Sequence, residues 1–271
     1  MSRGSAYPAS LYDATHTGTD GDVEFYRAAC AGARSVLELG CGSGRMLLAC
    51  VPPTAAVVGV DVHPELLSLA RDRASALSRP GSLDFLDGDM RNVRLGRRFD
   101  RVIIPYGGIF CLASDDELRA CLETVRVHLN PGGQVILDAY AADGFHADGE
   151  TRGEDARHFD AWREVKVIRI EGRRVRVEER SAWDRPAQQI LAQYRYTADD
   201  AIIAETELPQ RYLLAEQLLL ALMHAELEPI ALWGDFRETP FDPETSAHLV
   251  VVANAAHPGD GAEPVTSPSS A

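Results

Sequence analysis

A glycine-rich turn between a strand and a helix is the feature that most constrains this chain. Residues 35–45 are S-V-L-E-L-G-C-G-S-G-R, an apolar run followed by Gly40, Gly42 and Gly44 at alternate positions. An apolar, helix-like run over residues 46–51 follows at once. Because glycine has no Cβ, such a turn can bend sharply and let a ligand approach the backbone closely. A buried strand, a tight glycine turn and a helix start are typical of a nucleotide-type ligand site.

The spacing of these glycines shows whether the loop matches the fingerprint of a dinucleotide-binding site. The dinucleotide fingerprint G-x-G-x-x-G has its third glycine three positions after the second, where this chain has Arg45. Here the third glycine comes one residue earlier, and an acid, Glu38, stands two residues before Gly40. A glycine turn that binds no ligand would also fit this loop alone, so other segments must distinguish the alternatives.

Strands and helices are expected to alternate on either side of this turn. After the first strand, strands are expected over residues 57–60, 83–86, 99–105 and 134–140, with helices over 64–77 and 115–129. Asp61 ends the second strand 21 residues after Gly40, which is near the spacing of a ribose-binding acid in nucleotide-binding α/β folds. This alternation over about 110 residues predicts a doubly wound parallel sheet.

Five landmarks follow one another along this part of the chain. They are E-L-G-C-G-S-G, V-V-G-V-D, G-D-M, F-D-R-V-I-I-P-Y and L-N-P-G-G-Q-V-I-L-D. In this order and phase they resemble the class I S-adenosylmethionine-dependent methyltransferases. The resemblance implies an α/β fold with a doubly wound, seven-stranded, mostly parallel, Rossmann-like sheet. It also implies S-adenosylmethionine as the cofactor and methyl transfer as the reaction.

The segment after the fifth strand has a different pattern. Residues 141–160 are rich in Asp, Gly and His and are expected to form a loop or lid. Antiparallel strands are expected over residues 163–170, 173–183, 190–196 and 201–208, with a hairpin turn at Glu171-Gly172. A helix over residues 210–225 and strands over 228–233 and 248–253 complete the core. A similar antiparallel β-insertion is familiar from glycine/sarcosine and amino-sugar N-methyltransferases, where it covers the acceptor pocket or pairs subunits.

The predicted organisation therefore has four parts. They are an N-terminal arm (1–22), a cofactor-binding core (23–142 and 209–256), a lid and β-insertion (143–208) and a disordered tail (257–271). The arm has too few apolar residues to join a core, so we expect it to cover the bound cofactor.

The resemblance implies cofactor contacts at the carboxyl ends of the strands. Asp61 is expected to accept hydrogen bonds from both ribose hydroxyls, because an ionised carboxylate only accepts; a helix cap is the alternative. Asp89 is expected to accept from the adenine amino group while the Met90 N–H donates to a ring nitrogen; a turn acid is the alternative. Glu38 is expected to contact the cofactor; a structural role beneath the loop is the alternative. The implied set is Glu38, Gly40, Cys41, Gly42, Asp61, Val62, Asp89, Met90 and Pro105.

The catalytic and acceptor-binding residues are marked less sharply. The candidates are Tyr12, His16 and His146 for catalysis, and Tyr106, Arg211 and Tyr212 for the acceptor. His16 and His146 are the histidines best placed to act as a general base, and either could instead be an ordinary loop histidine. Arg211 and Tyr212 follow the insertion, where the family often has acceptor-facing residues; helix packing is their alternative. Tyr106 is expected in the wall nearest the sulfonium.

The net charge of the chain and the end of the fourth strand indicate the class of methyl acceptor. The chain has 41 acids against 27 bases, a net charge of −14, which repels a polyanion. The fourth strand ends in I-P-Y-G and lacks the N-P-P-Y of nucleic acid amino-methyltransferases. We therefore expect a small-molecule substrate and no nucleic acid partner, with nitrogen or oxygen as the attacking atom. A protein methyltransferase, a nicotinamide oxidoreductase and a non-catalytic cofactor-binding regulatory protein are the alternatives.

The spacing of the cysteines and the length of the apolar runs indicate the cellular compartment of the protein. The five cysteines lack C-x-x-C spacing, so reduced, mostly buried thiols are expected, and no His/Cys cluster has the spacing of a zinc site. No apolar run approaches the roughly 18 residues that would span a bilayer, and the N-terminus lacks the apolar core of a signal peptide. We therefore expect a cytoplasmic protein without a bound metal or membrane partner, and a homodimer formed through the β-insertion.

Overall fold

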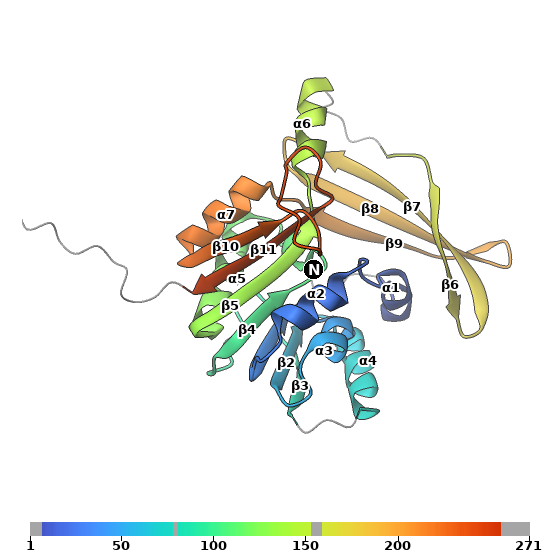
Figure 1. Cartoon of the computed structure of the whole chain (residues 1–271). Coiled ribbons are helices and arrows are strands. Elements are labelled where there is room, and N and C mark those ends of the chain that lie inside the picture. Colours follow the sequence, from blue (N-terminus) through green and yellow to red (C-terminus); the bar gives the residue numbers. More distant parts are fainter. Residues whose placement is uncertain (1–6, 78–80, 153–158, 256–271) are drawn as a thin grey trace, which may run out of the picture.

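The computed structural model describes residues 7–77, 81–152 and 159–255, which form two separate β-sheets (Figure 1). The larger sheet has seven strands in the order β10-β11-β5-β4-β1-β2-β3. Its strands are β1 (Ser35–Leu39), β2 (Ala56–Asp61), β3 (Leu83–Asp87), β4 (Phe99–Ile104), β5 (Leu129–Tyr140), β10 (Leu227–Trp233) and β11 (His248–Ala255). Strands β1 to β5 are parallel, and β11 is antiparallel to both β5 and β10. The predicted doubly wound, mostly parallel sheet is therefore confirmed.

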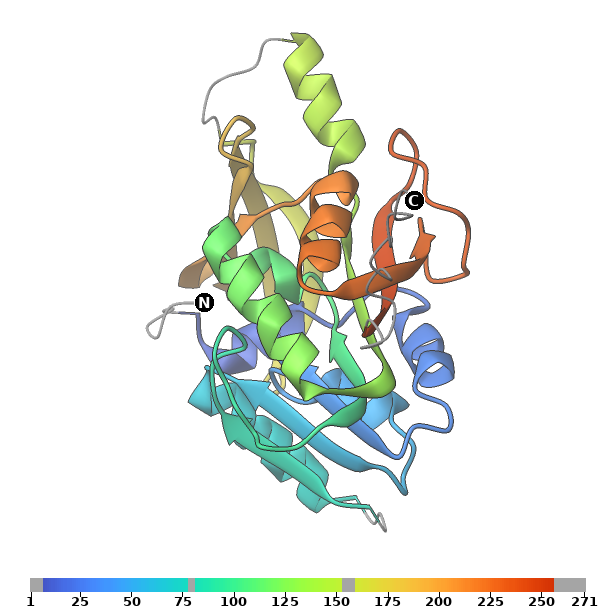
Figure 2. The same cartoon turned by 90° about the vertical axis from the view of Figure 1, so that its left-hand side faces the viewer.

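Helices cover both faces of this sheet, which is why its strands are almost continuously apolar. One face packs against α2 (Asp22–Ala29), α3 (Arg45–Cys50) and α4 (Pro64–Ser75). The other face packs against α5 (Asp115–His128) and α7 (Ala215–His224), the side seen in Figure 2. Successive residues of a strand therefore enter different layers: Val36 joins the first and Leu37 the second. The five cysteines are free thiols, all buried except the half-buried Cys111, as predicted.

The smaller sheet is antiparallel, in the order β6-β7-β8-β9. Its strands are β6 (Arg163–Ile170), β7 (Arg173–Asp184), β8 (Gln189–Ala198) and β9 (Ala201–Arg211). The turn between β6 and β7 has Glu171 at φ 50° and Gly172 at φ 80°, which suits the tight hairpin predicted there. This sheet confirms the predicted β-insertion, and we call it the insertion sheet.

Several boundaries differ from the prediction. Residues 143–152, predicted as part of a loop or lid, form helix α6 (Asp143–Arg152). Glycine disfavours a helix, but the absence of a Cβ lets other parts of the chain pack closely against α6. A Cβ on Gly149 would be 1.9 Å from the Arg185 side chain. The predicted helix over 210–225 begins only at Ala215, because Gln210 and Arg211 pair with β8. Strand β5 begins at Leu129 rather than at Gln134.

The N-terminal arm is also more structured than predicted. It forms helix α1 (Ala9–Thr15), and Tyr7 and Leu11 are 3% and 7% exposed. They pack on the apolar face of the insertion sheet, against residues such as Val177 and Tyr196. The expectation that the arm joins no core was therefore wrong, because one face of an antiparallel sheet has to be covered. The predicted disordered tail lies outside the described residues.

No helix in the described part of the chain is long and apolar enough to cross a membrane.

Candidate active site

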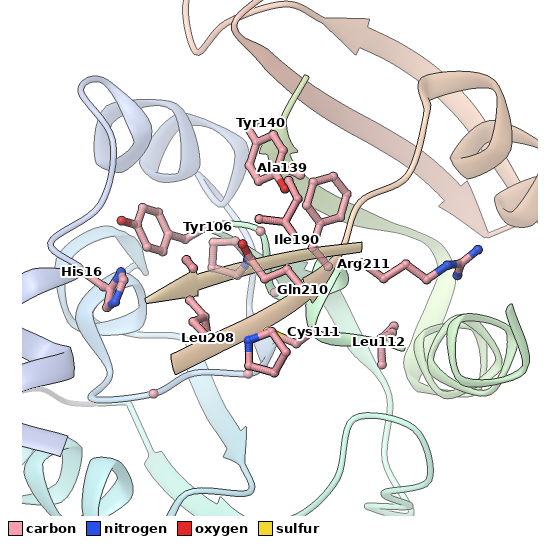
Figure 3. A pocket seen from close by; sticks show the side chains of 18 of the residues that line it. His16, Tyr106, Cys111, Leu112, Ala139, Tyr140, Ile190, Leu208, Gln210 and Arg211 are labelled. Atoms are coloured by element: carbon pink, nitrogen blue, oxygen red, sulfur yellow. The ribbon is translucent and has the colours of Figure 1, made fainter. Parts of the chain in front are cut away.

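A cavity of about 1040 Å³ lies where the carboxyl ends of the parallel strands face the insertion sheet (Figure 3). Its wall comes from the arm, the strand ends, the short helix η1 (Gly108–Cys111) and the insertion sheet. Figure 3 shows, among others, His16, Tyr106, Cys111, Tyr140, Ile190, Leu208, Gln210 and Arg211 around it. The volume is at the upper end of the roughly 300–1,000 Å³ of small-molecule sites, so the cavity has room for two ligands side by side.

Most residues that the sequence marked as candidates line this cavity. They are Tyr12, His16, Glu38, Gly40, Cys41, Gly42, Asp61, Val62, Asp89, Met90, Pro105, Tyr106 and Arg211. His146 and Tyr212 do not line it. The His146 ring nitrogen Nδ1 lies 2.9 Å from the Tyr212 hydroxyl, and Tyr212 is fully buried in the core beside α7. Helix packing, the alternative role for Tyr212, is therefore the one that the structure supports.

The glycine loop has the backbone that its sequence demands. Gly40, Gly42 and Gly44 have φ values of 78°, 52° and 77°, a region that residues with a Cβ avoid. The N–H groups of Gly40 and Cys41 both donate to the carbonyl of Val60, at 2.8 and 3.0 Å. The loop is therefore fixed to the end of β2, and its glycines leave room for a ligand to approach the backbone.

Asp61 ties the glycine loop to the start of α4. Its Oδ2 accepts from the Gly42 N–H at 2.7 Å, and its Oδ1 accepts from the His63 N–H at 2.8 Å. A carboxylate has about four lone-pair positions, so each oxygen keeps one for a ligand. The local structural role and the ligand role weighed from the sequence are thus compatible. Burial raises the pKa of Asp61 above its ordinary value.

The Gly88-Asp89-Met90 turn carries a partner that the sequence did not indicate. The Arg91 guanidinium donates to Asp89 Oδ1 from Nε at 2.9 Å and to Oδ2 from Nη2 at 2.5 Å. These hydrogen bonds hold the pKa of Asp89 below its usual range. A Cβ on Gly40 would be 3.0 Å from the Met90 methyl carbon, so this turn packs directly against the glycine loop.

Two buried polar atoms in the cavity wall have no hydrogen-bond partner among the described residues. They are Oε2 of Glu38, whose side chain is 2% exposed, and the hydroxyl of Tyr140. Burial raises the pKa of Glu38 well above its ordinary value, and the nearby Arg45 guanidinium partly opposes this. An unpaired buried polar group costs about 1–3 kcal/mol, so both atoms suit hydrogen bonds to a ligand.

Asp138 is a site residue that sequence reasoning missed. It lies near the end of β5 beside the cavity, and its Oδ1 accepts from the Tyr26 hydroxyl at 2.6 Å and from the Tyr106 N–H at 2.9 Å. Tyr106 has φ 55°, which is uncommon for a non-glycine residue, so Asp138 holds a strained turn. Burial raises the pKa of Asp138 to about 6. The sequence did contain a signal that could have identified Asp138. It is an acid near the end of a buried parallel strand, as Asp61 is on β2.

Aromatic rings from three parts of the chain meet at the other end of the cavity. The His16 ring lies 4.4 Å from the Tyr12 ring, 5.3 Å from Tyr194 and 6.3 Å from Tyr106, between ring centroids. Burial, with a contribution from the charge of Lys166, lowers the pKa of His16 to about 4. His16 is therefore neutral at physiological pH.

Comparisons with known proteins agree with this geometry. A methyltransferase domain family matches residues 36–133. The cypemycin N-terminal methyltransferase of a Streptomyces species is 30% identical over 81% of this chain and 82% of its own length. This chain is an S-adenosylmethionine-dependent methyltransferase.

Other methyltransferases resemble the chain over different extents. A dTDP-3-amino-3,4,6-trideoxy-alpha-D-glucopyranose N,N-dimethyltransferase of Streptomyces venezuelae is 27% identical over 65% of this chain, and the match spans only 63% of that relative. The solved CcbJ methyltransferase from Streptomyces caelestis is 26% identical, with a TM-score of 0.73 over 93% of this chain and 100% of that one. The sugar N-methyltransferase KedS8 from Streptoalloteichus, 22% identical with a TM-score of 0.68, covers 94% of each chain and shares the fold.

Membership of the methyltransferases resolves the alternatives about reaction class. The nicotinamide oxidoreductase and the non-catalytic regulatory protein are set aside, and S-adenosylmethionine is the cofactor. The cavity fits this group in three respects: a glycine loop open to close approach, spare acceptor positions on Asp61, and the unpaired Oε2 of Glu38. Among the described residues, no cluster of three or more His, Cys, Asp or Glu side chains could hold a metal ion.

Proposed function

We propose that this methyltransferase methylates an amine nitrogen of a small molecule. The observation that carries the proposal is the position of Glu179, which lines the cavity from β7 and is paired across the sheet with Tyr194. The arginines of the cavity wall are engaged by other acids: Arg45 by Asp22, Arg91 by Asp89 and Glu117, and Arg211 by Asp115. Glu179 thus offers negative charge next to aromatic faces, the surroundings that a cationic amine prefers.

The cofactor-binding part of the proposal uses the strand ends and the glycine loop. Asp61 would accept from the ribose hydroxyls, and Asp89 and the Met90 N–H would bind the adenine. The remaining proposed contacts are Glu38, Gly40, Cys41 and Gly42 for the methionine part, Val62 beside the adenine, and Pro105 near the sulfonium. The bound cofactor supplies an electrophilic methyl group on a sulfonium sulfur.

The protein's own task in this reaction is alignment and exclusion of water. An amine needs only to arrive neutral and in line with the methyl group, so positioning supplies most of the catalysis. Asp138 holds the strained turn that projects Tyr106 into the cavity. Tyr12 and the neutral His16 close the acceptor end from the arm. We propose that the neutral His16 accepts a hydrogen bond from the acceptor, and that Tyr140 and Arg211 contact its polar groups.

The names of the relatives support nitrogen as the attacking atom. The sugar relatives are N,N-dimethyltransferases, and the cypemycin enzyme is an N-terminal methyltransferase. A second candidate acceptor is therefore the terminal amine of a peptide. This acceptor is favoured because the match to the cypemycin enzyme spans 82% of that enzyme's length. An amino sugar and a peptide terminus present the same chemical group to Glu179.

The proposal is tested by transfer of a radiolabelled methyl group to matched acceptors. The panel consists of dTDP-amino sugars, the same sugars with a hydroxyl in place of the amine, and short peptides with a free or an acetylated N-terminus. We expect label on at least one amine and none on the matched hydroxyl or acetylated compound. Label on the hydroxyl sugars, with none on the amines, would overturn the assignment to nitrogen.

We further propose a role for each segment of the chain, a cellular compartment and an oligomeric state. Residues 23–142 and 209–256 bind the cofactor, and residues 1–22 and 143–208 cover the acceptor, with 257–271 as a tail. The protein works in the cytoplasm as a homodimer formed through the insertion sheet, which exposes the apolar residues Val165, Val167 and Ile202. Sedimentation analysis tests the dimer, and replacing Val165 and Val167 by Lys should yield a monomer.

A further inference from the structure

Three segments that are distant in sequence meet at the carboxylate of Asp13. Asp13 lies on α1, Ser43 lies in the glycine loop, and Arg73 lies in the last turn of α4. The Arg73 guanidinium donates to both carboxylate oxygens, from Nη1 to Oδ1 at 2.9 Å and from Nη2 to Oδ2 at 2.5 Å. Arg73 Nη1 also lies 2.8 Å from the Ser43 hydroxyl, which itself donates to Asp13. We call Asp13, Ser43 and Arg73 the arm contact.

This contact borders the cavity through Ser43. Ser43 lines the cavity, and so do Tyr12, from the same helix as Asp13, and His16, which directly follows that helix. Burial raises the pKa of the Tyr12 hydroxyl, and the nearby Cys111 and Asp61 raise it further, so Tyr12 lies near Asp61. Helix α1 therefore passes over the residues that the cofactor contacts, and it touches both α4 of the core and β6 of the insertion sheet (Figure 1).

Further hydrogen bonds join α1 and the residues next to it to the insertion sheet. Tyr7 and Thr15 bond to the Tyr196 hydroxyl, and Lys166 Nζ donates to the Thr15 carbonyl and the Thr17 hydroxyl, both at 2.8 Å. Loss of the arm contact would leave these bonds intact and free α1 from the glycine loop. The Asp13 and Arg73 side chains are 20% and 44% exposed, so water can replace their partners when they separate.

We propose that Asp13 and Arg73 are positioning residues that hold α1 against the glycine loop and set how long the cofactor stays bound. The contact has the two-pronged arginine–carboxylate geometry, which fixes direction as well as proximity. With it formed, Tyr12 and the glycine loop enclose the ligand from opposite sides. When it opens, α1 moves away with the insertion sheet, and the cofactor product exchanges.

The test is the dissociation rate of S-adenosylhomocysteine, measured by stopped-flow displacement. For Asp13→Asn and for Arg73→Gln we expect a rate faster by about tenfold, the size of one charged hydrogen bond. The two substitutions together should be no worse than either alone, because they remove one shared contact. The exchanged pair, Asp13→Arg with Arg73→Asp, should recover most of the wild-type rate.

Two further measurements separate positioning from general weakening. The matched control is Asp199→Asn, which removes an Arg–Asp pair of 2.7 Å on the insertion sheet and should leave the rate unchanged. In the protein without cofactor, amide exchange over residues 9–15 should become faster in Asp13→Asn but not in the control. If Asp13→Asn does not fold, Arg73→Lys decides, because it keeps the charge but loses the two-pronged geometry. A wild-type dissociation rate in folded Asp13→Asn or Arg73→Lys would overturn the proposal, as would an equal effect in the control.

Discussion

The hydroxyl groups of Tyr7 and Tyr196 lie 2.5 Å apart, although 189 positions separate the two residues in the chain. The Tyr196 hydroxyl also lies 2.9 Å from the Thr15 hydroxyl, and the Tyr7 hydroxyl lies 3.0 Å from Nε2 of His16. Burial is the main reason that the pKa of each tyrosine is raised, so both stay neutral hydrogen-bonding groups. The arm, which lines the cavity with Tyr12 and His16, is thus also part of the core of the insertion sheet.

Deleting residues 1–18 should therefore lower stability as well as activity. The deletion removes the buried Tyr7 and Leu11, and each such side chain is worth about 1.5–3 kcal/mol. For a chain of this size we expect a loss of about 6–24 °C in Tm, measured by circular dichroism. A melting temperature within a degree of the full-length protein would show that the arm only covers the ligand.

Replacing Asp61 by Ala should weaken cofactor binding at least tenfold. The change removes the acceptor for the Gly42 N–H and the acceptors that we assign to the ribose hydroxyls, at about 1.5–3 kcal/mol for each bond to a charged group. Calorimetry with S-adenosylhomocysteine measures the affinity. Asp84→Asn, on the neighbouring strand β3, is the control and should bind normally. Wild-type affinity in folded Asp61→Ala would reduce Asp61 to a local backbone anchor.

Asp138 should make stability fall as pH rises from about 4 to 6. Burial raises its pKa from 3.8 to about 6 in the folded protein. Between these values the folded state binds more protons than the unfolded state, so unfolding becomes easier with rising pH. The difference between the two pKa values corresponds to about 3 kcal/mol in total, of which about 2 kcal/mol is lost between pH 4 and pH 6.

The measurement compares urea unfolding of the wild type and Asp138→Asn across this pH range. The free energy of unfolding of the wild type, minus that of the variant, should decrease by about 2 kcal/mol between pH 4 and pH 6. A difference that stays constant with pH would mean that the folded-state pKa of Asp138 is not raised.

Replacing Glu179 by Gln should weaken binding of an amine acceptor without changing cofactor affinity. The substitution keeps the size of the side chain and removes its charge, so we expect KM for the acceptor to rise by about tenfold. Glu178→Gln is the matched control, because Glu178 is the adjacent residue of β7 and lies 3.8 Å from Arg176. Equal effects of the two substitutions on KM would argue against Glu179 as the amine-binding group.

The sequence alone determined the large sheet, the glycine loop and most of the candidate cofactor residues. These features depend on local signals: the apolar period of a strand, the backbone freedom of glycine, and an acid at a strand end. Gly40, Gly42 and Asp61 could be predicted because parallel strands bring their carboxyl ends to one edge, whatever the details of packing. The hairpin at Glu171-Gly172 was predictable for the same local reason.

The tertiary structure alone decided which distant side chains meet. Tyr26 reaches Asp138 across 112 positions, and Arg73 reaches Asp13 across 60, and neither pairing leaves a pattern within either segment. The same holds for Tyr212, whose position after the insertion suggested an acceptor contact but whose ring is buried beside α7. Helix α1 joins a core because the insertion sheet, formed more than a hundred residues later, offers an apolar face. Such contacts follow from the order and stacking of whole elements, so they exist only once the sheets have formed.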